Sequence, residues 1–325
     1  MVHTKSGDIM TFTELRARLN EFVLEQRNDD RSANTVKAYK ADIEHFLQWA
    51  EGRDGDTVTK ADAIAYKEYL QTLKIKRGKK SEPKSMATST INRRIISINK
   101  YLKWAGAADA AGAKPIRQQQ RATLEDVISK AEFERLLRAA NDPPEQARKA
   151  GIKPDRQLYM IMITFAYTGI RYNELQYFTV ESLRAARKTG KITVVNKGKE
   201  RAIPIRKSLI NELTEYCKEK DISSGYIFGT RNGTPLRNEQ VAKRLKRLAG
   251  YARIPKSKVH PHSFRHYFAK DYMQTYGRLD KLQSILGHAD ISTTTIYTTA
   301  TAKELADDLE KMDPIPKWGK NKGRR

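Results

Sequence analysis

The N-terminal third of the chain carries apolar residues at the three- and four-residue spacing of amphipathic helices. Thr11 with Glu14, and Thr59 with Asp62, have the spacing of capping pairs at the starts of two of these helices. Four successive amphipathic helices predict a small helical bundle. The predicted helices span residues 11–27, 34–50, 59–73 and 89–104.

A connecting segment follows the predicted bundle. Residues 105–122 are rich in Gly, Ala, Pro and Gln and show no apolar period, which suits a connection between two domains. We therefore predict a helical domain over residues 1–106, a linker over 107–123 and a second domain over 124–325.

The apolar pattern of the second domain is mixed. Two strands, 191–195 and 201–205, are joined by a loop that contains Gly198, and a short strand is expected at 226–228. The predicted fold is mainly α with a small antiparallel β-sheet. Its helices are expected over residues 130–140, 156–168, 172–178, 238–249 and 302–312.

The net charge of the chain indicates the kind of partner that it binds. The 325 residues have a formal net charge of +24 and a pI of about 9.9, which favours a polyanion, and nucleic acid in particular. A membrane surface is a weaker candidate, because no apolar run approaches the roughly 20 residues of a spanning helix. The alternative is a soluble protein with lysine-rich solvated faces.

Basic residues are concentrated in two places. Between residues 74 and 121 there are 13 Lys or Arg against two acids, Glu82 and Asp109, which favours contacts to phosphates over a merely solubilising face. A second basic helix, 238–249, could face a nucleic-acid groove or could be charged surface. The predicted contacts are Lys76, Arg77, Lys79, Lys80, Arg93, Arg94, Lys243, Arg244 and Arg247.

The single cysteine, Cys217, excludes an internal disulfide and fits an intracellular location. The first residues lack the apolar core of a secretory signal. We therefore expect a cytoplasmic protein.

Candidate chemistry gathers between residues 260 and 297. His262 and Arg265 are three apart, so on a helix they share a face, and they are followed by His288 and Tyr297. Arginine offers a planar fork for a phosphate, and tyrosine offers a nucleophile. A zinc site at His260, His262 and His266 is the alternative, but no cysteine or carboxylate nearby in sequence completes a tetrahedral set.

The ordered set of motifs resembles the tyrosine recombinase (phage integrase) family, over nearly the whole chain. The matching segments are Thr168-Gly169-Ile170-Arg171-Tyr172-Asn173-Glu174-Leu175, Lys197 with Gly198-Lys199-Glu200-Arg201 and Pro204, His262-Ser263-Phe264-Arg265, Leu286-Gly287-His288, and Tyr297. The resemblance implies a helical core-binding domain followed by a mixed α/β catalytic domain. It also implies site-specific recombination through a covalent 3′-phosphotyrosine.

Residue roles follow from this chemistry. A phenol is a weak nucleophile at its free pKa, so the phosphate it attacks must be held and neutralised, which suits Arg171 and Arg265. Arg171 lies where residues 172–178 are expected to begin a helix, whose free N–H groups would reinforce an anion site. His262 can orient the phosphate or exchange the tyrosine proton, and His288 is a further donor. No nucleotide, metal or other cofactor is required.

Proton donation to the leaving 5′ oxygen is assigned to Lys197 in the hairpin loop. Lys199 is the competing candidate, because the family's lysine motif usually has one more residue in this loop than the present sequence has.

The resemblance also implies partners. They are double-stranded DNA and three further copies of the chain, in a homo-tetramer on two DNA sites that exchanges the C-terminal helix 302–312 between subunits. Packing of that helix on its own domain is the alternative. Only about ten residues precede the first helix, so we expect no arm-binding domain and a Xer-like or mobile-element enzyme acting at a bacterial nucleoid. The alternative functions are a non-catalytic DNA-binding regulator and a type IB topoisomerase-like relaxing enzyme.

Overall fold

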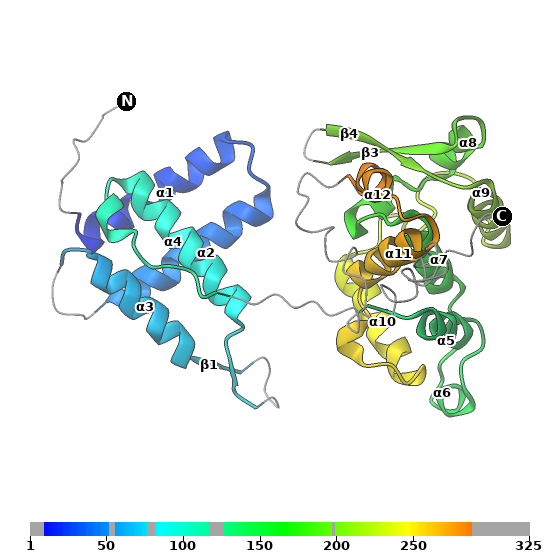
Figure 1. The fold of residues 1–325 in the computed structure, drawn as a ribbon, viewed down its shortest axis with the longest axis horizontal. Helices are drawn as coiled ribbons and strands as arrows, with labels where there is room; N and C mark the ends of the chain where they lie inside the picture. The colour runs from blue at the N-terminus through cyan, green and yellow to red at the C-terminus, as the bar shows by residue number, and fades with distance from the viewer. Residues whose placement is uncertain (1–9, 52–55, 77–81, 118–126, 197–198, 288–325) are drawn as a thin grey trace, which may run out of the picture. The chain divides into compact units, whose positions relative to one another are not determined.

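The chain folds into two units, residues 1–120 and 121–325 (Figure 1). The structure is a computed structural model that describes residues 10–51, 56–76, 82–117, 127–196 and 199–287. Each unit has its own buried apolar core. No helix in these ranges is long and apolar enough to cross a membrane.

The first unit is a bundle of four helices, and all four were predicted from the sequence to within about two residues. The capping boxes of Thr11 with Glu14 and of Thr59 with Asp62 both form. Aromatic rings from all four helices are fully buried in the bundle core: Phe22, Phe46, Tyr66 and Tyr101. The helices are α1 Phe12–Asn28, α2 Ala33–Ala50, α3 Lys60–Thr72 and α4 Thr88–Ala105.

The chain beyond α4 packs back on that helix. Ala107, Ala110 and Ala113 are buried in the core of the first unit. The side chain of Asn92 donates to the carbonyl of Ile116 at 2.8 Å and accepts from its N–H at 2.7 Å. The part of the predicted linker up to residue 117 is therefore packed on the first unit and does not form a free connection.

A small hairpin lies between α3 and α4. Strand β1 (Lys74–Ile75) pairs antiparallel with β2 (Lys84–Ser85), so the basic loop 76–80 connects two strands. Arg77, Lys79 and Lys80 fall outside the described residues.

The second unit is also mainly helical, with one antiparallel hairpin, so the predicted fold class is confirmed. Helices α6, α8, α9, α11 and α12 were not predicted as elements, and the predicted helix 302–312 lies outside the described residues. The predicted strand at 226–228 forms only an isolated bridge, between Tyr226 and Thr179. The elements are α5 Lys130–Asn141, α6 Glu145–Lys149, α7 Arg156–Thr168, η3 Tyr172–Tyr177, α8 Val180–Thr189, β3 Lys191–Asn196, β4 Lys199–Pro204, α9 Lys207–Glu219, α10 Asn238–Tyr251, η4 Lys256–Lys258, α11 Pro261–Tyr276 and α12 Leu279–Leu286.

One predicted helix takes a different form. Residues 172–178 were expected to be α-helical, but residues 172–177 form the 3₁₀ helix η3. The N–H of Arg171 at its start donates to the side chain of Glu174 at 2.7 Å. The N–H group that precedes this short helix is therefore satisfied by Glu174, and the expected anion site at the helix N-terminus stays a prediction.

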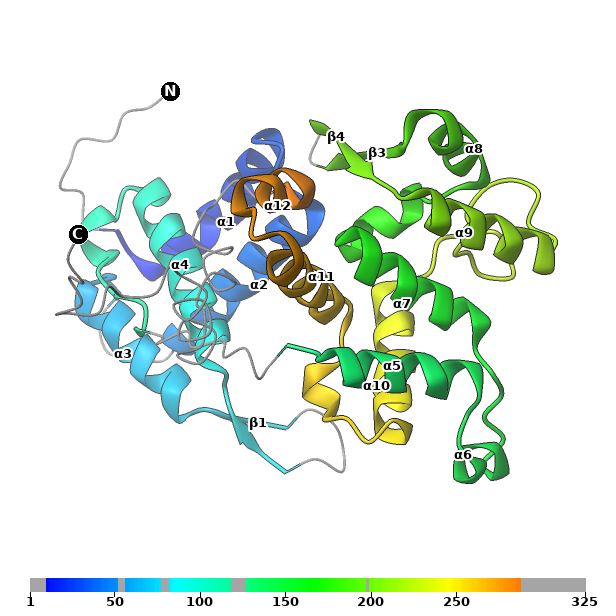
Figure 2. The ribbon, with the colours of Figure 1, turned by 45° about the vertical axis from the view of Figure 1, so that its right-hand side comes forward.

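Close packing of α7 and α11 brings the segment at Gly169–Arg171 next to the helix that carries His262 and Arg265 (Figure 2). Gly169 ends α7 with φ +63°, and a Cβ atom there would lie 2.5 Å from the ring of Phe268 on α11. Only glycine fits both the backbone conformation and this approach. The turn leading into Arg171 is therefore fixed against α11.

Candidate active site

Arg171 is held by a buried carboxylate. Glu174 is 2% exposed and accepts from the Arg171 N–H at 2.7 Å and from its Nη1 at 3.3 Å. A second arginine, Arg201 of β4, donates to the same carboxylate through Nε at 3.0 Å and Nη2 at 2.8 Å. Two guanidinium groups from separate elements therefore share one buried anion.

The pKa of Glu174 reflects this environment. Burial alone would raise the carboxyl pKa, but the hydrogen bonds from Arg201 and from the Arg171 N–H, together with both positive charges, lower it below its ordinary value. Glu174 is therefore ionised at neutral pH and fixes the directions of both arginine side chains.

Arg265 is almost completely buried. It lies on α11 with 2% of its surface exposed, and its Nη1 donates to the carbonyl of Gly169 at 2.6 Å. Its Nη2 donates to the carbonyl of Leu286 at 2.8 Å. The side chain thus links the end of α7 to the end of α12.

Arg171 and Arg265 meet at one turn. Arg171 Nη2 donates to the carbonyl of Gly287 at 3.1 Å, next to the Leu286 carbonyl that Arg265 binds. The two arginines are 94 positions apart in sequence (265 minus 171), so only the fold brings them to adjacent peptide groups. The fold therefore brings two of the six predicted catalytic residues to the same turn.

His262 lies on the same helix as Arg265, one turn earlier, and reaches the surface. Desolvation by the surrounding protein, aided by the charges of Arg265, His260 and Arg171, lowers the pKa of His262 below its ordinary value. Its ring packs edge to face on that of His266, with centroids 4.6 Å apart. His262 is therefore a neutral imidazole near Arg171 and Arg265.

Lys197, His288 and Tyr297 lie outside the described residues. Strand β3 ends at Asn196, immediately before Lys197, and pairs there with Lys199 of β4. The described chain ends at Gly287, immediately before His288.

Glu174 and Arg201 had no assigned role in the sequence analysis, although both lie in its motifs. Glu174 follows Arg171 by three residues, the spacing at which a carboxylate reaches back to an N–H group, and this signal could have identified it. Nothing in the sequence pairs Arg201 with Glu174, which is 27 residues away.

Two of the predicted DNA contacts in the first unit are engaged in an ion-pair cluster. Asp42, 2% exposed, accepts from Arg93 Nη1 at 2.5 Å and lies 3.7 Å from Arg94 Nε. The Arg94 side chain is only 17% exposed, whereas that of Arg93 is 48% exposed. Arg94 is therefore turned towards the bundle, whereas Arg93 is paired with Asp42 but half-exposed, and Lys76 is exposed.

The basic helix α10 divides in the same way. Arg244 was expected to face outward, but its Nε and Nη2 donate to Asp155 at 3.0 and 2.5 Å and its Nη1 donates to Gln157 at 2.8 Å. This expectation is therefore wrong for Arg244, which ties α10 to the start of α7. Lys243 and Arg247 are exposed.

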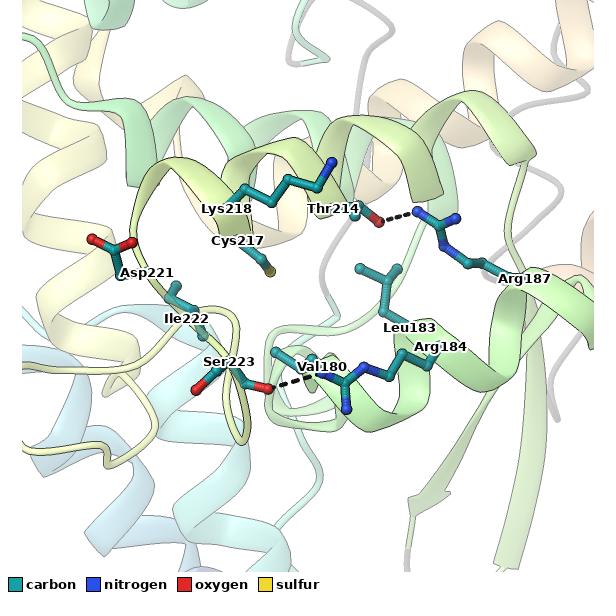
Figure 3. Close-up of a pocket in the computed structure, with 10 residues that line it drawn as sticks. All are labelled: Val180, Leu183, Arg184, Arg187, Thr214, Cys217, Lys218, Asp221, Ile222 and Ser223. Carbon is teal, nitrogen blue, oxygen red and sulfur yellow. Dashed lines mark hydrogen bonds between the residues drawn. The ribbon is translucent and has the colours of Figure 1, made fainter.

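One cavity lies away from these residues. It has a volume of about 840 Å³ and lies between α8 and α9, where Figure 3 shows Leu183, Cys217 and Ile222 along its apolar wall. Arg187 at its edge donates to Thr214 at 3.0 Å. Burial raises the pKa of the Cys217 thiol, as expected for a packing cysteine and not for a nucleophile. The arginine cluster is therefore the better candidate site.

Within the described ranges, no three His, Cys, Asp or Glu side chains gather as metal ligands do.

Comparison with known sequences and structures identifies the family. Residues 126–304 match the family described as "Phage integrase family", and residues 19–109 match "Phage integrase, N-terminal SAM-like domain". The chain is 29% identical over 299 residues to tyrosine recombinase XerD of Listeria innocua, which covers 87% of this chain and 93% of that protein. It is 29% identical over 292 residues to tyrosine recombinase XerC of Xanthomonas campestris, covering 88% and 84%.

Among solved structures, the Tn1549 transposon integrase in complex with circular intermediate DNA has the same fold. The TM-score is 0.65 at 18% identity, covering 93% of this chain and 99% of that one. The chain belongs to the phage integrase family. It is a tyrosine site-specific recombinase, an enzyme that breaks and rejoins DNA strands. The regulator and topoisomerase alternatives are not favoured by these relatives.

Proposed function

We propose that Tyr297 attacks the scissile phosphate, that Arg171 and Arg265 bind its non-bridging oxygens, and that His262 exchanges the tyrosine proton. His288 is a further donor to the phosphate, and Lys197 protonates the leaving 5′ oxygen, with Lys199 as the competitor. Cleavage forms the tyrosine–phosphorus bond as the phosphorus–5′ oxygen bond breaks. The 3′-phosphotyrosine preserves the bond energy, and attack by a 5′ hydroxyl reverses the step.

The observation that carries this proposal is the convergence of Arg171 and Arg265 on the adjacent carbonyls of Gly287 and Leu286. A phosphodiester in its transition state carries charge on its equatorial oxygens, and fixed positive groups stabilise it without reorganisation. His288, the third proposed phosphate donor, directly follows Gly287 in the sequence.

The proposal requires a movement at Arg265. The whole residue is 2% exposed, so a phosphate can reach its guanidinium only if the groups that cover it move when DNA binds. Arg171, with 34% of its side chain exposed, needs no such change. Arg171 is therefore the arginine that meets the phosphate first.

His262 has the protonation state that a general base needs. Because its pKa is lowered from the ordinary value, the imidazole is neutral at pH 7 and can accept the tyrosine proton. Protonation at lower pH adds a charge beside two arginines, so cleavage should weaken as pH falls through this pKa.

The proposed assembly is a homo-tetramer on two DNA duplexes at a bacterial nucleoid. Residues 302–312 carry Leu305, Leu309 and Met312 at helical spacing, and a helix with such a stripe needs an apolar groove. We assign that groove to the neighbouring subunit. Within each copy, Lys76, Arg93, Lys243 and Arg247 supply exposed charge for DNA phosphates.

Replacing Tyr297 with Phe tests the function directly. The variant should form no covalent protein–DNA adduct on a denaturing gel, while its DNA affinity stays within about twofold, because a single hydroxyl contributes little to a phosphate-dominated interface. Tyr276→Phe is the matched control, since this tyrosine of α11 is 63% exposed and far from any assigned role. A 3′-linked adduct in the Tyr297→Phe variant would falsify the assignment.

A further inference from the structure

Arg201 joins three separate parts of the second unit. It lies on β4 opposite Val194 of β3, two residue pairs from the end of the hairpin ladder. Its Nε and Nη2 bind both oxygens of Glu174 on η3, at 3.0 and 2.8 Å. Its Nη1 donates to the carbonyl of Ile285 on α12 at 2.7 Å. One planar group thus fixes the hairpin relative to η3 and to α12.

The backbone after α12 is fitted to this guanidinium. Gly287 has φ +61°, and a Cβ atom there would lie 2.9 Å from Arg201 Nη1 and 3.1 Å from its Cδ. The glycine therefore provides the left-handed conformation and also the space for Arg201. This close approach is independent of the ion pair to Glu174, and it places Arg201 against the turn whose carbonyls Arg171 and Arg265 bind.

We infer that Arg201 is a positioning residue, which fixes the position of the β3–β4 hairpin relative to Arg171 and to the turn at residues 286–287. The inference rests on the proposed function, in which the lysine that protonates the leaving oxygen belongs to this hairpin, whether it is Lys197 or Lys199. The position of the hairpin then decides whether that lysine reaches the leaving oxygen. In this role Arg201 acts through the hairpin, because its guanidinium donates to Glu174 and to the carbonyl of Ile285.

Loss of Arg201 should displace the hairpin more than it displaces Arg171. Arg171 keeps its N–H bond to Glu174 and its Nη2 bond to Gly287. The hairpin keeps its apolar packing and one polar contact to η3, in which the Tyr177 hydroxyl donates to the carbonyl of Val195 at 2.8 Å. Proton donation should therefore suffer while phosphate binding is retained.

Arg201→Lys is the informative variant. Lysine keeps a positive charge beside the buried Glu174, but one ammonium cannot reproduce a fork that spans two carboxylate oxygens and the Ile285 carbonyl. Single-turnover cleavage is measured on ordinary DNA and on DNA with sulfur at the bridging 5′ position, which leaves without a proton. Filter binding gives the Kd of each variant.

On ordinary DNA the Arg201→Lys protein should cleave at least about tenfold slower, since general-acid help is worth about 10²–10⁴-fold and misplacement removes part of it. Its Kd should stay within about threefold of the parent, because the phosphate contacts remain. On the sulfur substrate its rate should match the parent. Equal loss on both substrates would mean a general structural role, and no loss on either would mean no role; both overturn the inference.

Two further variants keep the test decisive. Tyr177→Phe removes the second polar contact of the hairpin without touching Glu174, and should show a smaller loss that sulfur also rescues; if Arg201→Lys does not fold, this variant decides. Arg184→Lys is the matched control, because Arg184 is an exposed arginine of α8 that donates to the Ser223 carbonyl. It should cleave both substrates at the parent rate.

The Tyr297→Phe protein separates the two levels of failure. An adduct in that variant would sink the proposed function and the inference together. If Tyr297→Phe is inactive and Arg201→Lys cleaves ordinary DNA at the parent rate, only the inference fails.

Discussion

Replacing Glu174 with Gln should destabilise the second unit strongly. The change leaves Arg171 and Arg201 side by side without their shared anion, although Gln has nearly the shape of Glu. Removing one partner from a buried ion pair typically costs about 3–5 kcal/mol. Because the Arg171 and Arg201 side chains are 34% and 17% exposed, water screens part of this, and we expect the lower end, about 3 kcal/mol.

The matched control is an ion pair of the same length on the surface. Glu215 lies 2.8 Å from Lys218, as Glu174 does from Arg201, but the Glu215 and Lys218 side chains are 67% and 69% exposed. Exposed ion pairs contribute about 0.2–1 kcal/mol, so Glu215→Gln should lower the free energy of unfolding by about 1 kcal/mol at most. The difference between the two variants isolates the effect of burial.

The Glu174 effect should depend on pH in a defined direction. The pKa of its carboxyl is lower in the folded chain than the ordinary value it has when unfolded. The folded state thus gains stability above the ordinary pKa and loses it as pH falls through the folded pKa. The stability gap between the parent and Glu174→Gln should therefore be constant at neutral pH and should close in acid.

The assay must report on the second unit alone. Two of the three tryptophans, Trp49 and Trp104, lie in the first unit, so their fluorescence follows that unit and serves as an internal control. Hydrogen exchange of peptides from α7 and α11, measured against urea, gives the free energy of unfolding of the second unit. The reasoning is refuted if Glu174→Gln is no more destabilising than Glu215→Gln, or if the loss persists unchanged in acid.

Three further predictions concern the reaction. Lys197→Ala should cleave ordinary DNA about 10²–10⁴-fold slower while still binding, and sulfur at the bridging 5′ position should restore its rate. The Lys199→Ala protein is the control and should cleave ordinary DNA well. If Lys199→Ala is instead the slow variant that sulfur rescues, Lys199 is the general acid. Deletion of residues 302–325 should abolish synapsis of two sites in a gel-shift assay but spare binding to a single site; full recombination by the truncated protein would show that the segment is dispensable. DNA affinity should fall steeply with salt as Lys and Arg contacts release counterions, whereas cleavage should survive excess EDTA, and restoration of EDTA-blocked cleavage by magnesium or zinc would contradict the metal-free mechanism.

Local pattern was sufficient for several of the helices, although not for α8, α9 and α12, each of which also buries an apolar stripe. Helices α1 to α4, α5, α7 and α10 follow from apolar spacing and capping, because the side chains that decide them lie within a turn or two of each other. The strands β3 and β4 follow from alternation across a short glycine loop. The motif set was enough to place the chain in its family, because the order and separation of the motifs can be read from the sequence without the fold.

Long-range partners were decided only by the tertiary structure. Arg244 looked like one of several outward charges on a basic helix, yet Asp155, 89 residues away, holds it. Arg94 is turned inward towards Asp42, and Ala107, Ala110 and Ala113 are buried in the core of the first unit although no local apolar period predicts it. Residues 172–177 became a 3₁₀ helix, with the Glu174 carboxylate drawn between Arg171 and Arg201.

The same distinction divides the active site. The sequence names Arg171 and Arg265 as phosphate ligands because guanidinium chemistry is a property of the residue. That they bind adjacent carbonyls of one turn, and that Arg201 lies against that turn, depends on α7, η3, β4, α11 and α12 packing together. Residue types fix which reaction is open to the chain. The distances between the candidate site residues depend on contacts between residues tens of positions apart, and only the folded core brings such residues together.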